Sequence, residues 1–180
     1  MAISNIKVIA NSKTLDHLHN LLDQVEEKER IGDSLLAIIN TFYDSVEMQD
    51  GGVKRTWMMD NTSTKWIQMN DIIDDGKFSV ESQGYPPGKF FRQLYNILIP
   101  YDENMKIEVE YYDSDYGIIG SYLMKCCDGD HQFWHESETT DVENLINSDS
   151  WDEIYDQQKL LLKKCYSIIE SDGDPISEID

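Results

Sequence analysis

Residues 81–100 read ESQGYPPGKFFRQLYNILIP and place two adjacent prolines directly before a run rich in aromatic residues. Proline has no N–H to donate to a sheet, its fixed φ suits the first turn of a helix, and it favours extended backbone in the residue before it. Residues 84–87 therefore predict a strand-to-helix junction, and we expect the helix to end at Pro100. Its apolar stripe consists of Phe90, Phe91, Leu94, Tyr95 and Leu98.

Further elements are indicated on both sides of this junction by the spacing of apolar residues. The predicted strands cover residues 3–10, 53–59, 77–83, 105–112 and 116–126, with a polar turn at 60–66 and the last two strands forming an antiparallel hairpin. The other predicted helices cover residues 12–29, 34–43 and 151–170. Residues 128–149 read as a polar, acidic loop around Phe133 and Trp134.

This order of elements predicts an α+β fold. We expect a ferredoxin-like two-layer sandwich, in which a mostly antiparallel sheet has helices packed on one face, with a C-terminal acidic loop and helix added. A single domain is expected over residues 1–170, with an acidic extension from about residue 127. Residues 171–180 are expected to form a mobile acidic tail.

Charge is the strongest compositional signal. The chain of 180 residues carries 35 acidic and 15 basic side chains, a net charge of −20. Residues 101–180 hold most of this excess. A negative field repels phosphate backbones, so direct nucleic-acid binding is not expected, whereas basic proteins are favoured partners, including those that hold nucleic acid themselves. A merely well-solvated acidic surface is the alternative.

The N-terminal sequence lacks the apolar core and cleavage site of a signal peptide, and no apolar stretch reaches the ~20 residues of a membrane span. We therefore expect a cytoplasmic protein without a membrane partner. The three cysteines are an odd number and two of them are adjacent, so a disulfide framework is not expected.

Two segments, TWMMDNTSTKW (56–66) and KFSVESQGYPPGKFFRQLYNILIPYDENMKIEVEYYDSDYGIIGSYLMK (77–125), resemble the YubB-type ferredoxin-like domain. The matching positions are Thr64-Lys65-Trp66, Pro86-Pro87, Tyr111 or Tyr112, Gly117 and Gly120. The chain departs from the family at Thr62-Ser63, where the family has Trp-Gly, and at Gly84-Tyr85, where it has Trp-Ser. The resemblance covers about residues 1–126. It implies the ferredoxin-like fold and an origin in phages, plasmids or other mobile elements of a bacterial host, and it implies no chemistry.

Motifs for metal binding and catalysis are weak. Cys126, Cys127, His131 and His135 include zinc-ligand types, but adjacent cysteines on a strand point to opposite faces. A calcium loop beginning at Asp113 would need glycine at its sixth position and glutamate at its twelfth, and these positions hold Ile118 and Met124. No catalytic triad, P-loop or dinucleotide motif is present, so we expect no metal, no cofactor and no catalytic residues.

Two groups of residues are candidate sites. A Lys-aromatic cluster of Trp57, Lys65, Trp66 and Tyr85 could receive an anionic or planar ligand, although aromatic side chains more often belong to a core. The acidic C-terminal third could bind a partner, with Phe133, Trp134, Trp151 and Tyr155 as aromatic anchors. Its carboxylates are Asp128, Asp130, Glu136, Glu138, Asp141, Glu143, Asp149, Asp152, Glu153 and Asp156.

These observations favour an interaction protein that inhibits a basic host protein, such as a nuclease or another defence component, by binding it. Carboxylates spaced along a surface could imitate the phosphates of duplex DNA, which carries one charge per ~1.7 Å. The alternative is a small-ligand-binding or cryptic enzymatic domain that uses the Lys-aromatic cluster. A third possibility is self-association through the helices.

Overall fold

The structure, a computed structural model, describes residues 1–30, 34–127 and 129–170. The strands are β1 (Ala2–Ile9), β2 (Met48–Gln49), β3 (Gly52–Val53), β4 (Ile67–Asp74), β5 (Lys77–Ser82), β6 (Lys106–Asp113), β7 (Ile118–Cys127) and β8 (Asp130–Thr139). The helices are α1 (Ser12–Arg30), α2 (Ser34–Phe42), α3 (Arg55–Thr62), α4 (Gly88–Leu98), the 3₁₀ turn η1 (Ile99–Tyr101), α5 (Val142–Asn147) and α6 (Trp151–Glu170). Asp128 and the expected tail at 171–180 lie outside the described residues.

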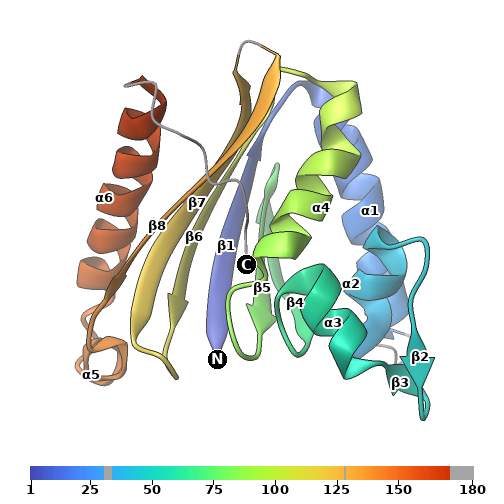
Figure 1. Cartoon of the computed structure of the whole chain (residues 1–180), viewed down its shortest axis with the longest axis horizontal. Coiled ribbons are helices and arrows are strands. Elements are labelled where there is room, and N and C mark those ends of the chain that lie inside the picture. Colours follow the sequence, from blue (N-terminus) through green and yellow to red (C-terminus); the bar gives the residue numbers. More distant parts are fainter. Residues whose placement is uncertain (31–33, 128, 171–180) are drawn as a thin grey trace.

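One antiparallel sheet organises the described chain, with strands in the order β4-β5-β1-β6-β7-β8. Helices α1, α2 and α4 pack on one face through a large apolar core, which includes Ile107 and Val109 of β6. Figure 1 shows α1 and α4 on one side of the sheet and α6 on the other. The α+β class and the antiparallel sheet are confirmed.

The C-terminal helix packs on the opposite face of the sheet. Successive residues of a strand point to opposite faces, and β7 follows this rule. Its Tyr122 and Met124 enter the main core, whereas Ile119 and Leu123 enter two smaller cores beneath α6. The prediction of helices on a single face therefore applies to the helices before residue 101, and α6 adds a partial third layer over β6, β7 and β8.

The junction at residues 84–87 is confirmed. It connects β5 to α4, and the N–H of Phe91 donates to the carbonyl of Pro87 at 3.1 Å as the helix begins. All members of the predicted stripe are buried, namely Phe90, Phe91, Leu94, Tyr95 and Leu98. Pro100 lies in the 3₁₀ turn that follows α4.

The expected strand at 53–59 is wrong, because helix α3 occupies most of it. Trp57 and Met58 are neighbours that both reach the core, which the alternation of a strand would not allow. Ser63 ends the helix in the left-handed conformation, with φ 66°. Strand β4 follows the turn and was not predicted. Two register shifts interrupt its pairing with β5, so the strand lacks the regular alternation of apolar and polar residues that indicates a strand in a sequence.

The expected polar loop at 128–149 is also wrong, since residues 130–139 form the long strand β8. Phe133 and Trp134 explain why this polar segment is a strand. Phe133 packs in the main core and Trp134 packs beneath α6, so neighbouring aromatic residues anchor the strand on both faces of the sheet.

A close approach between β6 and β7 requires glycine at position 120. Tyr111 lies opposite Gly120, and a Cβ atom at position 120 would lie 2.4 Å from the Cζ and Oη atoms of the Tyr111 ring. Tyr111 is buried, so its ring has little room to move aside.

We expect Gly120→Ala to lower the free energy of unfolding by about 1–3 kcal/mol, the usual cost of overpacking a core. Urea denaturation measures this change. Gly52→Ala is the matched control, because nothing lies within 4 Å of a Cβ there. Adding Tyr111→Leu should relieve the clash, so the double variant should lose less stability than the two single losses combined. Strictly additive losses would contradict the assigned contact.

Candidate functional site

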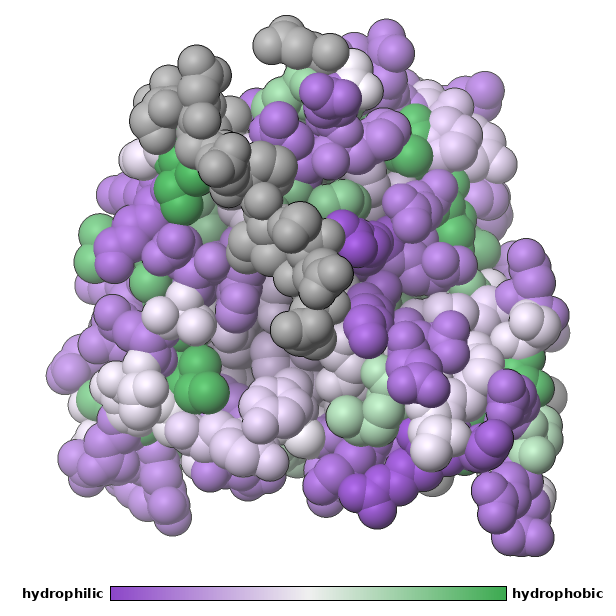
Figure 2. All heavy atoms as spheres, viewed as in Figure 1, coloured by the Kyte–Doolittle hydropathy of each residue, from purple (hydrophilic) through white to green (hydrophobic). Residues whose placement is uncertain are grey.

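The carboxylates of the C-terminal third follow a path from β8 through α5 into α6. Residues 126–158 contain no lysine or arginine. Six exposed carboxylates gather where α5, the following loop and the first turns of α6 meet. We call this set the acidic end, and it consists of Asp141, Glu143, Asp149, Asp152, Glu153 and Asp156. Hydrophilic side chains surround a few apolar ones at the lower left of Figure 2, where α5 lies in Figure 1.

Some of these carboxylates also stabilise the helices that carry them. Asp141 caps α5, because its Oδ1 atom accepts a hydrogen bond from the N–H of Asn144 at 3.1 Å. Asp152 and Glu153 lie in the first turn of α6, where the helix dipole favours negative charge. Asp156 forms an exposed ion pair with Lys159 at 3.8 Å, which contributes little to stability.

A shallow hollow extends the acidic end to the turn between β6 and β7. It has a volume of about 370 Å³ and is lined by Ser114, Asp115, Glu143, Ile146 and Asn147. Asp115 is paired with the N-terminal amine of Met1. Two segments far apart in the sequence thus contribute carboxylates to the same hollow.

The remaining predicted carboxylates lie along β8. Asp130 is exposed at the turn from β7, which is the far end of β8 from α5. Glu136 and Glu138 are partly exposed and lie between these two places. The predicted set therefore divides into the acidic end and a line of carboxylates on the outermost strand.

The predicted aromatic anchors are mostly unavailable to a partner. Phe133 is 7% exposed and Trp134 is 1% exposed, because each fills a core on its own face of the sheet. Trp151 is half-buried against Tyr112, with ring centroids 5.9 Å apart. Tyr155, which is 42% exposed, is the aromatic side chain that the acidic end offers to a partner.

The Lys-aromatic cluster does not surround one cavity. Trp57 is buried with its ring centroid 5.2 Å from that of Tyr43. The Trp66 indole N–H donates to Oε1 of Gln83 at 2.9 Å. Tyr85 is exposed and stacks on Tyr116, with ring centroids 4.9 Å apart. Lys65 is exposed in the turn between α3 and β4.

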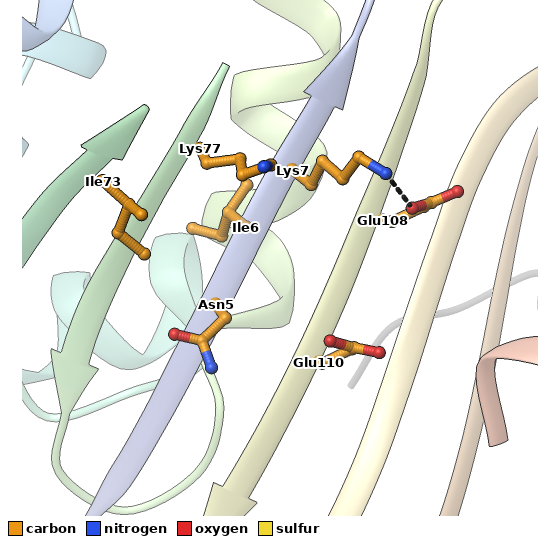
Figure 3. A pocket seen from close by; sticks show the side chains of 7 residues that line it. All are labelled: Asn5, Ile6, Lys7, Ile73, Lys77, Glu108 and Glu110. Carbon is orange, nitrogen blue, oxygen red and sulfur yellow. Dashed lines mark ion pairs between the residues drawn. The ribbon is translucent and has the colours of Figure 1, made fainter. Parts of the chain in front are cut away.

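A groove lies on the part of the sheet that α6 leaves open. Its volume is about 240 Å³, and it is lined by Asn5, Ile6, Lys7, Ile73, Lys77, Glu108 and Glu110 (Figure 3). Lys7 pairs with Glu108 at 3.5 Å. Tyr166 of α6 donates its hydroxyl to Glu108 and accepts a hydrogen bond from Lys106. The charges around Glu108 are thus largely engaged with one another.

Glu110 faces the same groove. Burial, and to a smaller extent repulsion from Glu108, raises the pKa of Glu110. A carboxylic acid with a raised pKa is a possible proton donor. The groove is smaller than the ~300–1,000 Å³ of typical ligand sites, so it would not enclose a metabolite. Sequence reasoning missed it, because its residues come from four separate strands.

The zinc-type residues are not assembled into a ligand set. Cys126 lies opposite His131 in the β7–β8 ladder, and Nδ1 of His131 is 3.2 Å from the Tyr95 hydroxyl. His135 instead bonds the Tyr111 hydroxyl. Among the residues that the structure describes, no group of three His, Cys, Asp or Glu side chains could hold a metal ion. The same part of the chain contains no helix long and apolar enough to span a membrane.

Comparisons with protein-family models, with curated proteins and with solved structures find no match to this chain. The resemblance to YubB-type domains stays a prediction.

His135 of β8 is held between two tyrosine side chains. Its Nε2 atom is hydrogen-bonded to the Tyr111 hydroxyl at 2.8 Å, and its ring stacks on Tyr122 with centroids 4.1 Å apart. Burial lowers the pKa of His135 from 6.5 to about 4. A neutral imidazole between two tyrosine rings is a structural element of the core rather than an exposed acid or base.

This lowered pKa predicts a pH-dependent stability. Between pH 6.5 and 4 the unfolded chain binds a proton at residue 135 that the folded chain does not, so stability falls as the pH falls. The contribution lost between pH 7 and pH 5 is about 2 kcal/mol, at 1.36 kcal/mol for each pKa unit. His135→Phe should flatten this dependence in urea denaturation. Equal pH dependence in wild type and His135→Phe would contradict the assignment.

Proposed function

We propose that this chain is an acidic interaction protein that binds a basic partner through the acidic end and strand β8. The observation that carries this proposal is the absence of lysine and arginine from residues 126–158, combined with the gathering of exposed carboxylates where α5 meets α6. Opposite charge on a partner would steer the encounter and fix the orientation of the complex.

The partner that this chemistry fits is a protein whose basic surface normally holds nucleic acid. Carboxylates on rigid elements can occupy positions that phosphates would take in a basic groove, and Tyr155 can supply an aromatic contact among them. Inhibition of a host nuclease or another defence component by such nucleic-acid mimicry is the function we infer. The resemblance to domains of phages and plasmids supports this class of target.

We further propose a ferredoxin-like core for the first two-thirds of the chain. The support is the order β4-β5-β1-β6 with antiparallel pairing throughout, in which β5 lies between β1 and β4. Helices α1 and α4 provide the connections of two split βαβ units, α1 between β1 and β4 and α4 between β5 and β6. A ligand-binding function is less well supported, because the Lys-aromatic cluster is not assembled around a cavity.

Charge reversal at the acidic end tests the proposal. The wild-type chain should capture basic proteins from a bacterial lysate. We expect the triple variant Asp152→Lys, Glu153→Lys and Asp156→Lys to bind the same proteins with an affinity at least about tenfold lower. Added duplex DNA should displace the same proteins from the wild-type chain. Quantitative mass spectrometry of the captured proteins and titration of those recovered are the measurements.

The matched control carries Asp16→Lys, Asp23→Lys and Glu27→Lys, three exposed carboxylates on α1. Both variants change the net charge equally, so equal losses would mean that total charge acts rather than the acidic end. Full capture by the α6 variant, with its helix content intact by circular dichroism, would refute the proposal.

A further inference from the structure

The two edges of the sheet differ in how they are protected. An edge strand presents unpaired N–H and C=O groups that can pair with another chain. At the β4 edge, two register shifts interrupt the strand, and the Glu29 carboxylate bonds the backbone of Met69. At the other edge, β8 keeps an unbroken register with β7 over its ten residues. No strand in the described part of the chain pairs with the outer side of β8.

The register identifies which backbone groups face outward from β8. The N–H of Thr140 donates to the carbonyl of Gly117 at 2.8 Å, one step beyond the paired residues Thr139 and Ile118. Residues of an antiparallel pair alternate between bonding the neighbouring strand and pointing away from it. Residues 132, 134, 136 and 138 therefore bond β7. The N–H and C=O groups of residues 131, 133, 135 and 137 point to the open edge.

The side chains of β8 add a charge pattern to this edge. Glu136 and Glu138 share the sheet face of Trp134, which is the face that α6 covers. No salt bridge joins either carboxylate to a cation within the described residues. A strand added beside β8 would place every second side chain next to these two glutamates.

We propose that an extended basic segment of the partner adds to the sheet as an antiparallel strand alongside β8, like every other pair in this sheet. Its backbone would bond residues 131, 133, 135 and 137, and its lysine or arginine side chains, at alternate positions, would lie beside Glu136 and Glu138. This inference rests on the proposed function and names the form in which the partner binds. A second copy of this chain is a poorer occupant, because β8 pairing with itself would bring acidic side chains against acidic side chains.

A synthetic peptide as long as β8, in which lysine alternates with threonine or valine, tests this geometry on the full chain. Lysines beside Glu136 and Glu138 would have their own N–H groups turned away from β8, so the threonine and valine N–H groups would bond it. We expect N-methylation of the threonine and valine amides to weaken binding by at least about tenfold. N-methylation of the lysine amides should leave the affinity unchanged, although both peptides keep the same charge.

Amide hydrogen exchange read by NMR locates the peptide. Binding should slow exchange at His131, Phe133, His135 and Ser137. Equal affinity of the two methylated peptides, no binding of the unmodified peptide, or no slowing at these four amides would overturn the inference. The inference would also be overturned if the chain formed a dimer without peptide, as measured by sedimentation, and if that dimer already protected these four amides from exchange.

A pair of variants provides the complementary test. Ser137→Pro removes an outward N–H that β7 does not use, and proline is tolerated on edge strands. Ser137→Ala removes the same hydroxyl and keeps the N–H. We expect Ser137→Pro to weaken peptide binding by at least about tenfold and Ser137→Ala to leave it unchanged. Equal binding by the two variants would overturn the strand addition. The proposed function fails separately, if charge reversal on α6 leaves the capture of basic proteins unchanged.

Discussion

The packing of α6 against the back of β6, β7 and β8 is the constraint on which the acidic surface depends. Ile154 and Leu161 of α6 meet Ile119 of β7, and the Ser121 hydroxyl donates to the carbonyl of Gln158 at 2.9 Å. This contact converts a polar C-terminal third into rigid structure. Without it, β8 would have one covered face, and Val142 of α5 would lose Ile154 and Leu161 from the core that buries it.

Rigidity matters to the function because charge on an ordered surface binds differently from charge on a disordered chain. Carboxylates held by helices and a strand keep their spacing before a partner arrives, so less conformational entropy is lost on binding. Apolar cores on both faces of the sheet hold β8 in place. Phe133 reaches the main core and Trp134 reaches the core under α6, so one pair of neighbouring residues fixes β8 in place. Phe133 and Trp134, which the sequence indicated as anchors for a partner, are therefore buried residues that hold the acidic strand in position.

The sequence predicted best where one local signal agreed with burial. The Pro86-Pro87 junction and the stripe after it identified α4, because chain geometry and apolar spacing indicate the same boundary. Helix α3 was missed because its buried apolar residues, Trp57 and Met58, are adjacent and show no helical period, and the third buried residue, Thr62, is polar. Strand β8 was missed because Phe133 and Trp134 are its only residues that reach a core, and the core that buries Trp134 depends on α6, which follows later in the chain. The acidic end was predictable in composition, but its separation from the carboxylates of β8 required the fold.

The most direct test of this account is the footprint of a bound partner on the intact chain. Hydrogen exchange measured with and without a basic protein recovered from a bacterial lysate would show which amides the partner protects. The account predicts that protection is confined to β8, α5 and the first half of α6. Protection centred on α1, α2 and α4, with β8 and α5 exchanging as in the free chain, would contradict it.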